Sequence, residues 1–303
     1  MPDPVEFQYD AASALSKGGR ELQEDAVTSH FPAGAGHGFV VLADGMGGHA
    51  AGDVASTLVV QEVTAALRPF SADPEDLEAS IGPHFDRALE RANAMVARRT
   101  AIQPELHGMG ATLVASLIVG NRLYWISVGD SPLYLLRGLR LSRLNQEHSL
   151  ARRMDRMVSN GLMTRGEADE NPDRDCLTSV IHGEAIAEID RRDHPLDLMD
   201  GDIVIVASDG LQTLSDSRIA ALVHASRSRP SAEILARLLN EINGMDDPDQ
   251  DNVSICVVKI AKVGRAAPAA APPSVSVIRT SIQLRVQGRD RHLTARYSSD
   301  RKG

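Results

Sequence analysis

Three short apolar runs in this sequence each border an aspartate, and this repeated pattern limits the possible folds more than any other feature. The runs are residues 38–42, 203–207 and 253–258, and the bordering aspartates are Asp44, Asp209 and Asp251. Short runs rich in β-branched residues predict buried strands. A fold that suits this chain must therefore bring several strand ends, each with a carboxylate, to one place.

Clustered carboxylates at strand ends indicate a site for a hard cation. Mg²⁺ and Mn²⁺ prefer carboxylate and carbonyl oxygens to thiolates. Gly45 and the glycines that follow it allow a tight turn that brings main-chain carbonyls close to an ion. A single Asp-Gly after a strand is usually only a turn, so the prediction depends on the repetition. A nucleotide-binding P-loop is not expected, because no Gly-Lys-Ser/Thr follows these glycines.

A further acidic pair precedes the strand expected at residues 26–31. Glu24 and Asp25 lie directly before this strand, and Arg20 lies upstream of them. The planar guanidinium of an arginine can bind two oxygens of one phosphate. Arg20 is thus a candidate phosphate ligand next to the candidate metal ligands.

Six motifs, in their order and spacing, resemble the metal-dependent serine/threonine phosphatases of the protein phosphatase 2C family, in its bacterial form. The motifs are Arg20-x-x-x-Glu24-Asp25, Asp44 to His49, Gly108 to Leu113, Val128 to Ser131, Ser208 to Leu211, and Asp251-Asn252. The resemblance runs from about Ala11 to Val263. Each motif alone is weakly informative, whereas the ordered set is specific.

The resemblance implies a centre of two Mn²⁺ or Mg²⁺ ions, with a third ion as an open alternative. The implied metal-site residues are Glu24, Asp25, Asp44, Gly45, Asp130, Asp209 and Asp251. Asp44 would bridge two ions, with the Gly45 carbonyl on one ion and with Asp209 and Asp251 on the other. Such a centre would hydrolyse a phosphate monoester with a metal-activated water. No covalent phosphoenzyme is implied.

The remaining residues of the implied site have supporting roles. Glu24 and Asp25 would hold metal-bound waters, and Arg20 would bind the substrate phosphate. Asp130 matches a ligand of the third ion. The implied catalytic residues are Arg20, Asp44, Asp209 and Asp251.

The sequence departs from the family pattern at several positions. Met46 takes the place of a histidine that many members use as the acid for the leaving group. His49 lies three residues further on, so we expect it to be structural and leaving-group protonation to fall to water. Pro132 replaces the usual arginine after Asp-Ser, and Thr213 replaces a common acidic residue. The last two departures weaken the expected third-ion site.

The order of predicted elements indicates an α+β protein, because strands and helices come in blocks. Strands are expected at residues 5–15, 26–31, 38–42, 111–119, 122–128, 133–136, 185–190, 202–207 and 253–258. Helices are expected at residues 53–67, 74–99, 217–225 and 231–243. The resemblance implies a four-layer sandwich of two antiparallel sheets between helix layers, with a mobile flap at residues 152–173. Residues 146–149 are expected to mark a helix start.

Charge and composition divide the chain near residue 264. Residues 264–303 carry eight Lys/Arg and two Asp/Glu, a net +6, which leaves −15 for the remainder of a chain whose total is −9. An Ala/Pro-rich stretch at 264–273 is typical of a semi-rigid linker. We therefore predict a phosphatase domain at 1–263 and a linker with a basic tail at 264–303. The acidic domain makes nucleic acid a poor partner.

The tail has two alternative interpretations. Residues 274–278 and 281–286 alternate polar and apolar side chains, which is strand periodicity and predicts pairing with the edge of this domain or of a protein partner. The other interpretation is a disordered, solubilising tail. A membrane-surface role is less favoured, because the tail lacks the apolar face of an amphipathic helix.

The sequence indicates a cytoplasmic protein without a membrane span. No run of 18 or more apolar residues occurs, and the first residues do not look like a secretory signal. The two cysteines, Cys176 and Cys256, form no disulfide or zinc pattern, and Cys256 is expected to be buried. The only tryptophan, Trp125, is expected in the core.

The function expected from these observations is hydrolysis of phosphoserine and phosphothreonine in proteins, which would reverse the action of a bacterial serine/threonine kinase. The alternative from another class is a catalytically weak regulatory module that binds a phosphoprotein or another partner. The complete aspartate set favours the enzyme, whereas Met46, Pro132 and Thr213 keep the module open. A small-molecule phosphatase also remains open.

Overall fold

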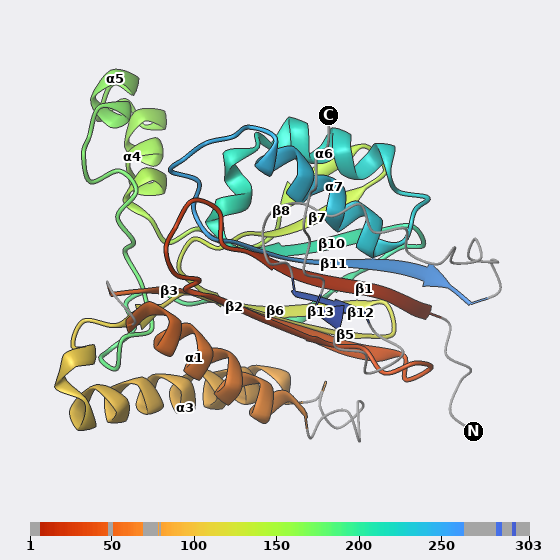
Figure 1. Ribbon diagram of the computed structural model, residues 1–303, viewed down its shortest axis with the longest axis horizontal. Helices are drawn as coiled ribbons and strands as arrows, with labels where there is room; N and C mark the ends of the chain where they lie inside the picture. The colour runs from red at the N-terminus through yellow and green to blue at the C-terminus, as the bar shows by residue number, and fades with distance from the viewer. Residues whose placement is uncertain are drawn as a thin grey trace, which may run out of the picture.

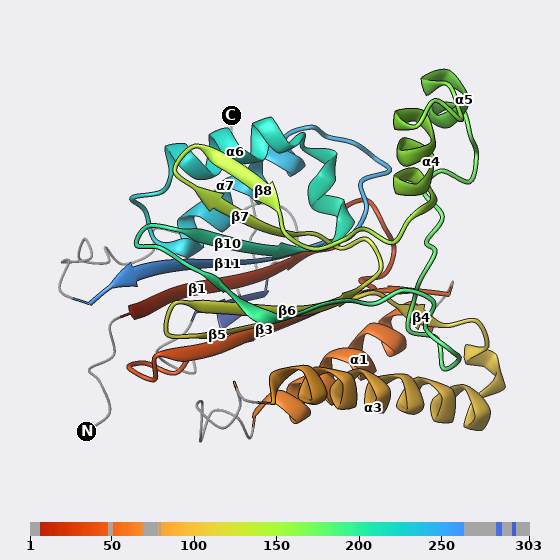
Figure 2. The same ribbon diagram turned by 180° about the vertical axis from the view of Figure 1, so that it is seen from behind.

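The computed structural model describes residues 7–47, 51–68, 78, 80–263, 283–286 and 293–294. Two antiparallel β-sheets pack face to face, and a pair of helices covers the outer face of each (Figures 1 and 2). The predicted four-layer α+β sandwich is confirmed. Among the described residues, no helix is both long and apolar enough to cross a bilayer.

One sheet has six strands and carries the two long helices of the chain. Its strand order is β2 (Asp25–His30), β3 (His37–Met46), β5 (Leu113–Val119), β6 (Arg122–Val128) and β9 (Asp190–Asp197), and β4 (Gly110–Ala111) also pairs with β3. Helices α1 (Ala51–Leu67) and α3 (Ile81–Ile102) cover its outer face. Val59 and Phe85 from these helices are fully buried against Val41 of the sheet. The short helix η2 (Pro104–Leu106) follows α3.

The other sheet has seven strands and joins the two ends of the chain. Its strand order is β13 (Leu293–Thr294), β12 (Gln283–Val286), β1 (Phe7–Ser16), β11 (Val253–Lys262), β10 (Ile203–Ala207), β7 (Leu133–Arg137) and β8 (Arg140–Arg143). Helices α6 (Asp216–Ala225) and α7 (Ser231–Asn243) cover its outer face. Leu235 and Leu238 of α7 pack there against Ile255.

The inner faces of the two sheets share an apolar core. Leu42 of β3, Val206 of β10 and Cys256 of β11 are all fully buried in it. Trp125 is 3% exposed and donates from Nε1 to the Asp190 carboxylate at 3.0 Å. The predicted burial of Cys256 and Trp125 is therefore confirmed, and this core fixes the relative position of the two sheets.

The prediction for residues 185–190 was wrong, because the strand in this region, β9, begins only at Asp190. Strand β9 lies at the edge of its sheet and reads Asp-Arg-Arg-Asp-His-Pro-Leu-Asp. Charged residues and proline are typical of edge strands, where they discourage pairing with another chain. An edge strand of this kind has no apolar periodicity that could reveal it. The expected helix start at 74–76 lies outside the described residues, and α3 begins at Ile81.

A helical segment interrupts the sheet pattern where a flap was expected. Helices α4 (Leu150–Ser159) and α5 (Arg165–Asp169) project beyond the sandwich at one end (Figure 1). Ser149 accepts from the Arg152 main-chain N–H and so caps α4, as expected for residues 146–149. Thr164 and Glu167 form a capping box at the start of α5.

The tail contributes a short strand to the edge of the seven-stranded sheet. Strand β12 pairs with β1 at Ala12 and Ser13, whereas β1 pairs with β11 along all ten of its residues. The strand periodicity predicted for residues 281–286 thus corresponds to a strand, and residues 274–278 lie outside the described residues. The domain boundary near residue 264 stays a prediction.

Truncation after Val263 should leave a folded sandwich, because the long β1–β11 pairing remains intact. Only the few main-chain hydrogen bonds to β12 are lost, each contributing ~1 kcal/mol, so Tm should fall by less than about 8 °C. Thermal unfolding followed by circular dichroism checks this expectation. Truncation after Thr294, which keeps β12 and β13, is the matched control. Loss of cooperative unfolding in the shorter chain alone would make the tail an integral part of the sheet.

Candidate metal centre

The predicted site aspartates lie together at one end of the sandwich. Asp25 and Asp44 face each other directly across strands β2 and β3. Asp209 opens the short helix η3 (Asp209–Thr213) just after β10, and Asp251 lies just before β11. The site is therefore built by strands of both sheets.

The charges of these carboxylates act on one another. The pKa of Asp44 is raised well above its ordinary value, first by burial and then by the charges of Asp25, Asp209, Asp130 and Asp251. Burial followed by neighbouring charges also raises the pKa of Asp25 to about 7. The pKa of Asp209 is raised by burial and by the charge of Asp251. Such mutual repulsion indicates a place where a cation is favoured.

The main chain at Asp44 is fixed from two sides. Asp44 donates its N–H to Thr112 Oγ1 at 3.0 Å and accepts the Thr112 N–H at 2.8 Å. Gly45 donates to the carbonyl of Glu24 at 3.1 Å. A Cβ on Gly45 would lie only 1.9 Å from the Gly52 carbonyl oxygen. Only glycine fits at this close approach of two segments.

Asp25 is held by two serines of the opposite sheet. Ser208 donates its hydroxyl to Asp25 Oδ2 at 2.7 Å and accepts the Ser254 N–H at 2.9 Å. The other oxygen of Asp25, Oδ1, is buried without a hydrogen-bond partner. Ser208 lies in a predicted motif, but its role in holding Asp25 was not predicted.

Asn252 organises the loop that carries Arg20 and Glu24. Its Oδ1 accepts the Glu24 N–H at 2.7 Å, and its Nδ2 donates to the carbonyls of Lys17 and Leu22 at 2.8 and 3.0 Å. The only sequence signal of this role was the presence of an asparagine directly after Asp251. Its contacts cross more than 200 positions of the sequence and so could not be predicted from local pattern.

Arg20 lies at the mouth of the carboxylate cluster. Its Nη2 forms an ion pair with Asp251 Oδ2 at 2.8 Å, and both side chains are about half exposed. Exposed ion pairs contribute little stability, so this guanidinium can exchange partners at small cost. Burial raises the pKa values of Glu24 and Asp209, and the charge of Arg20 opposes this rise. Arg20 thus lies where an anion approaching the carboxylates would meet it.

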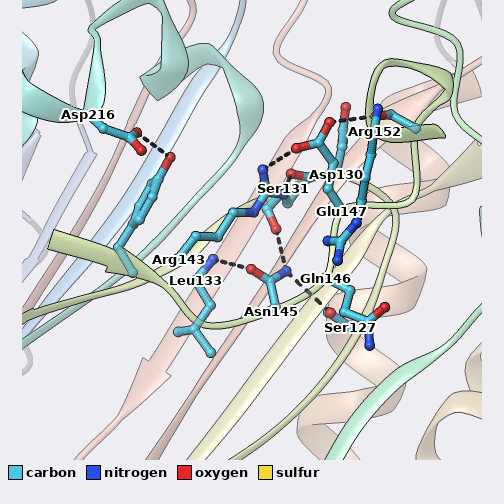
Figure 3. Close-up of polar contacts among 12 residues, drawn as sticks. Ser127, Asp130, Ser131, Leu133, Arg143, Asn145, Gln146, Glu147, Arg152 and Asp216 are labelled. Atoms are coloured by element: carbon cyan, nitrogen blue, oxygen red, sulfur yellow. Dashed lines mark hydrogen bonds and ion pairs between the residues drawn. The ribbon is translucent and has the colours of Figure 1, made fainter. Parts of the chain in front are cut away.

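Asp130 follows Gly129 in the turn after β6 and completes the cluster. Gly129 has φ +98°, and a Cβ there would also lie 2.7 Å from the Thr112 side chain, so glycine is required. Burial and then the charge of Asp209 raise the pKa of Asp130 to about 7, and the Arg143 guanidinium opposes this shift. Figure 3 shows Asp130 with Arg143 and Glu147 beside it.

The donor set fits a hard divalent cation. The site offers carboxylates from both sheets and buried oxygens on Glu24 and Asp25 that have no hydrogen-bond partner. Within the described residues, no group of three or more acidic, histidine or cysteine side chains lies close enough together to hold a metal ion by itself. An open arrangement suits Mg²⁺ or Mn²⁺, because these ions keep several water ligands and need few carboxylates each. The site residues themselves were predicted, and their metal roles stay predictions.

The residues that depart from the family pattern differ in how far they are buried. Pro132 is buried, and its carbonyl accepts the Ala207 N–H at 3.1 Å. Thr213 is exposed at the end of η3. His49 lies outside the described residues, so its predicted structural role stays a prediction.

Residues 17–247 match the family model described as protein phosphatase 2C. A serine/threonine protein phosphatase PstP of Mycobacterium tuberculosis is 34% identical over 227 residues, which cover 75% of this chain and 41% of that protein. The chain therefore spans less than half the length of this relative. The protein phosphatase PhpP of Streptococcus pneumoniae is 28% identical over 245 residues, which cover 80% of this chain and 94% of that protein.

Solved structures show the same fold. The catalytic domain of PstP in complex with two manganese ions superposes with a TM-score of 0.64 at 31% identity, covering 84% of this chain and 99% of that one. A serine/threonine phosphatase of S. agalactiae superposes with a TM-score of 0.69 at 25% identity, with 84% and 99% covered. The family match, the relatives and the shared four-layer fold agree with one another, and the chain belongs to the protein phosphatase 2C family.

Proposed function

We propose that this chain hydrolyses phosphoserine and phosphothreonine in proteins at a binuclear Mn²⁺ or Mg²⁺ centre, and so opposes a serine/threonine kinase. The observation that carries the proposal is the convergence of Asp25, Asp44, Asp209 and Asp251 from both sheets, with Arg20 at the mouth. The relatives named serine/threonine phosphatases support the reaction class. The PstP structure with two manganese ions supports the metal.

Phosphate monoesters resist hydrolysis in water, so the site must stabilise a large charge. When bound, two metal ions would supply a nucleophilic hydroxide and neutralise charge on the phosphoryl oxygens. In this chain Asp44, Asp209 and Asp251 would hold those ions, together with the Gly45 carbonyl. Glu24 and Asp25 would orient water molecules through their unpaired oxygens.

Arg20 would bind and orient the phosphoryl group. Its ion pair with Asp251 engages one of its nitrogens, Nη2, and leaves other N–H donors of the guanidinium for phosphate oxygens. Because the pair is exposed, an arriving phosphate can draw the guanidinium away from Asp251. The side chain would then bind the substrate phosphate.

The leaving group is proposed to take its proton from water. Met46, which directly follows the Asp-Gly pair, carries no exchangeable proton and is only partly buried. The resemblance places an acid at this position in many relatives. This chain would therefore depend more on the acidity of the departing serine or threonine hydroxyl than a relative with an acid at this position.

A second candidate function is a phosphatase-like module that binds a phosphoprotein with little turnover. It is favoured by Met46, Pro132 and Thr213, which replace groups expected in an active centre. Hydrolysis of p-nitrophenyl phosphate and of a phosphothreonine peptide, each with Mn²⁺ and with a chelator, separates the candidates. Chelator-sensitive turnover of the peptide supports the proposed function. Peptide binding without turnover supports the module, and turnover of the small ester alone supports a small-molecule phosphatase.

The proposed partners follow from the proposed reaction. They are phosphoprotein substrates and a cognate serine/threonine kinase in the cytoplasm, with the basic tail as a candidate contact for a protein partner. Within the tail, the structure describes only β12 and β13. The ions are proposed as Mn²⁺ or Mg²⁺, with a third ion at Asp130 as an alternative.

Asp44→Asn should lower kcat by several orders of magnitude, because a carboxylate that would hold the ions loses its charge. The fold should persist, since the main-chain contacts of Asp44 with Thr112 do not involve its carboxylate. Steady-state kinetics with Mn²⁺ and circular dichroism check both expectations. Glu90→Gln, at an exposed position of α3, is the control. Turnover near that of the unmodified chain in folded Asp44→Asn would remove Asp44 from the mechanism.

Arg20→Ala should raise KM for a phosphopeptide by roughly ten-fold or more, as expected for loss of a charge-assisted contact. Metal affinity measured by calorimetry should change little. Arg20→Lys keeps the positive charge but cannot donate two parallel hydrogen bonds as a guanidinium does. Its KM for the phosphopeptide should therefore lie between those of Arg20→Ala and the unmodified chain. Weaker metal binding at constant KM would assign Arg20 to the metal rather than to the phosphate.

The metal-free protein should lose stability as pH rises from about 4 to about 7. The folded-state pKa values of Asp25 and Asp130 are raised from 3.8 to about 7, so the folded state binds more protons than the unfolded state in this window. Stability is then greatest below the unfolded pKa and falls as pH rises through the folded pKa. Thermal melts with a chelator at pH 5 and pH 8 measure the effect. Mn²⁺ should reduce it, and a metal-free Tm that rises with pH would contradict it.

A further inference from the structure

The segment from Arg143 to Ser149, called here the bridging segment, lies between the metal centre and the flap. It begins at the end of β8 and runs into the first turn of α4. Along this short path it contacts the Gly129–Ser131 turn repeatedly (Figure 3). The turn carries Asp130, so the same segment contacts the metal centre and starts the flap helix.

Arg143 makes the central contacts of the bridging segment. Its Nη2 donates to the main-chain carbonyl of Asp130, and its Nη1 forms an ion pair with Glu147 Oε2 at 2.6 Å. The side chains of Arg143 and Glu147 are 17% and 27% exposed, whereas those of the flap pair Arg165 and Asp155 are 55% and 45% exposed. Partly buried, charge-assisted hydrogen bonds are stronger than exposed ones.

Glu147 continues the chain of contacts to the flap helix. Its other carboxylate oxygen accepts the Ser149 hydroxyl. Ser149 in turn accepts the Arg152 N–H at 3.3 Å and so caps α4. Asp130, Arg143, Glu147 and Ser149 therefore form one continuous series of hydrogen bonds that ends at the first turn of α4.

A second set of contacts fixes the frame around this series. His148 donates its N–H to the Gly129 carbonyl at 2.9 Å and accepts the Gly129 N–H on Nδ1 at 3.1 Å. Asn145 accepts the Leu133 N–H at 2.8 Å and donates to the Ser131 carbonyl at 2.9 Å. His148 and Asn145 hold the main chain of the turn at Gly129 and Ser131, whereas the Arg143 side chain joins the Asp130 carbonyl to the Glu147 carboxylate.

We propose that Arg143 is a positioning residue that couples the Asp130 turn to the flap helix α4. An arginine suits this role, because its fork can serve an acceptor on each of two segments. Pro132 has no side-chain donor, so the guanidinium beside Asp130 comes instead from β8. The proposal deepens the proposed function by naming what keeps the flap next to the metal centre, and it rests on that function only for its kinetic readout.

Hydrogen exchange of the full-length chain with Mn²⁺ tests the coupling without reference to activity. Arg143→Ala should speed exchange of the amides in the first turns of α4 by roughly ten-fold, as expected for loss of hydrogen bonds to charged groups. Glu147→Gln should have a similar effect, and the double variant should add little to either single one. Arg140→Ala, an exposed arginine on the same strand, should leave exchange in α4 unchanged.

A second readout is the affinity for Mn²⁺ measured by calorimetry. A third is whether the substitution changes kcat or KM in steady-state kinetics. Arg143→Ala should weaken Mn²⁺ binding by a few-fold. It should also raise KM for a phosphopeptide more than for p-nitrophenyl phosphate, because under this proposal only the larger substrate would reach the flap. If the proposed phosphatase activity is absent, hydrogen exchange and Mn²⁺ binding still decide the coupling.

Several results would overturn the proposal. Unchanged exchange in α4 for Arg143→Ala would do so, as would fully additive effects in the double variant. Exchange that rises equally in α1 and α4 would show a general loss of stability. If Arg143→Ala does not fold, Arg143→Lys replaces it, and unchanged α4 exchange in both Arg143→Lys and Glu147→Gln would count against the coupling.

Discussion

The repulsion between closely spaced carboxylates is the constraint on which the site depends. Asp25 and Asp44 face each other across two paired strands, and like charges in this position destabilise a sheet. The structure tolerates the pair because an apolar core fixes both sheets, because Ser208 of the opposite sheet donates to the Asp25 carboxylate, and because Thr112 holds the main chain of Asp44. A divalent cation would relieve this repulsion. It would also bind more tightly to carboxylates that the fold already holds close together than to carboxylates that must first be brought together.

The strands that end at the site could be predicted from the sequence, because a strand that is buried on both faces is a continuous run of apolar residues. The runs that became β3, β10 and β11 were recognised, and each carries its aspartate to the same end of the sandwich. Strand β9 was missed, since charged edge strands carry no such signal. The roles of Ser208 and Asn252 were also missed, because their partners lie far away in the sequence and hydrogen bonds between distant segments leave no local pattern.

Each part of the site comes from a different part of the chain. The loop before β2, the end of β3, the turn after β6 and the ends of β10 and β11 all contribute, and Asn252 and Arg143 connect these segments by side-chain hydrogen bonds to main-chain carbonyls. A site assembled in this way exists only in the folded state. Single substitutions at Asn252 or Arg143 would therefore change its geometry without removing a carboxylate.

The pairing of β1 with β11 has a consequence for biosynthesis. Phe7 pairs with Lys262 and Ser16 with Val253, so β1 leaves the ribosome long before its partner strand β11. Contacts of such long sequence separation form slowly, and an unpaired strand edge is prone to aggregation meanwhile. Asp251 directly precedes β11, so a nascent chain cannot complete its carboxylate cluster until nearly all of the strands of the core have been translated.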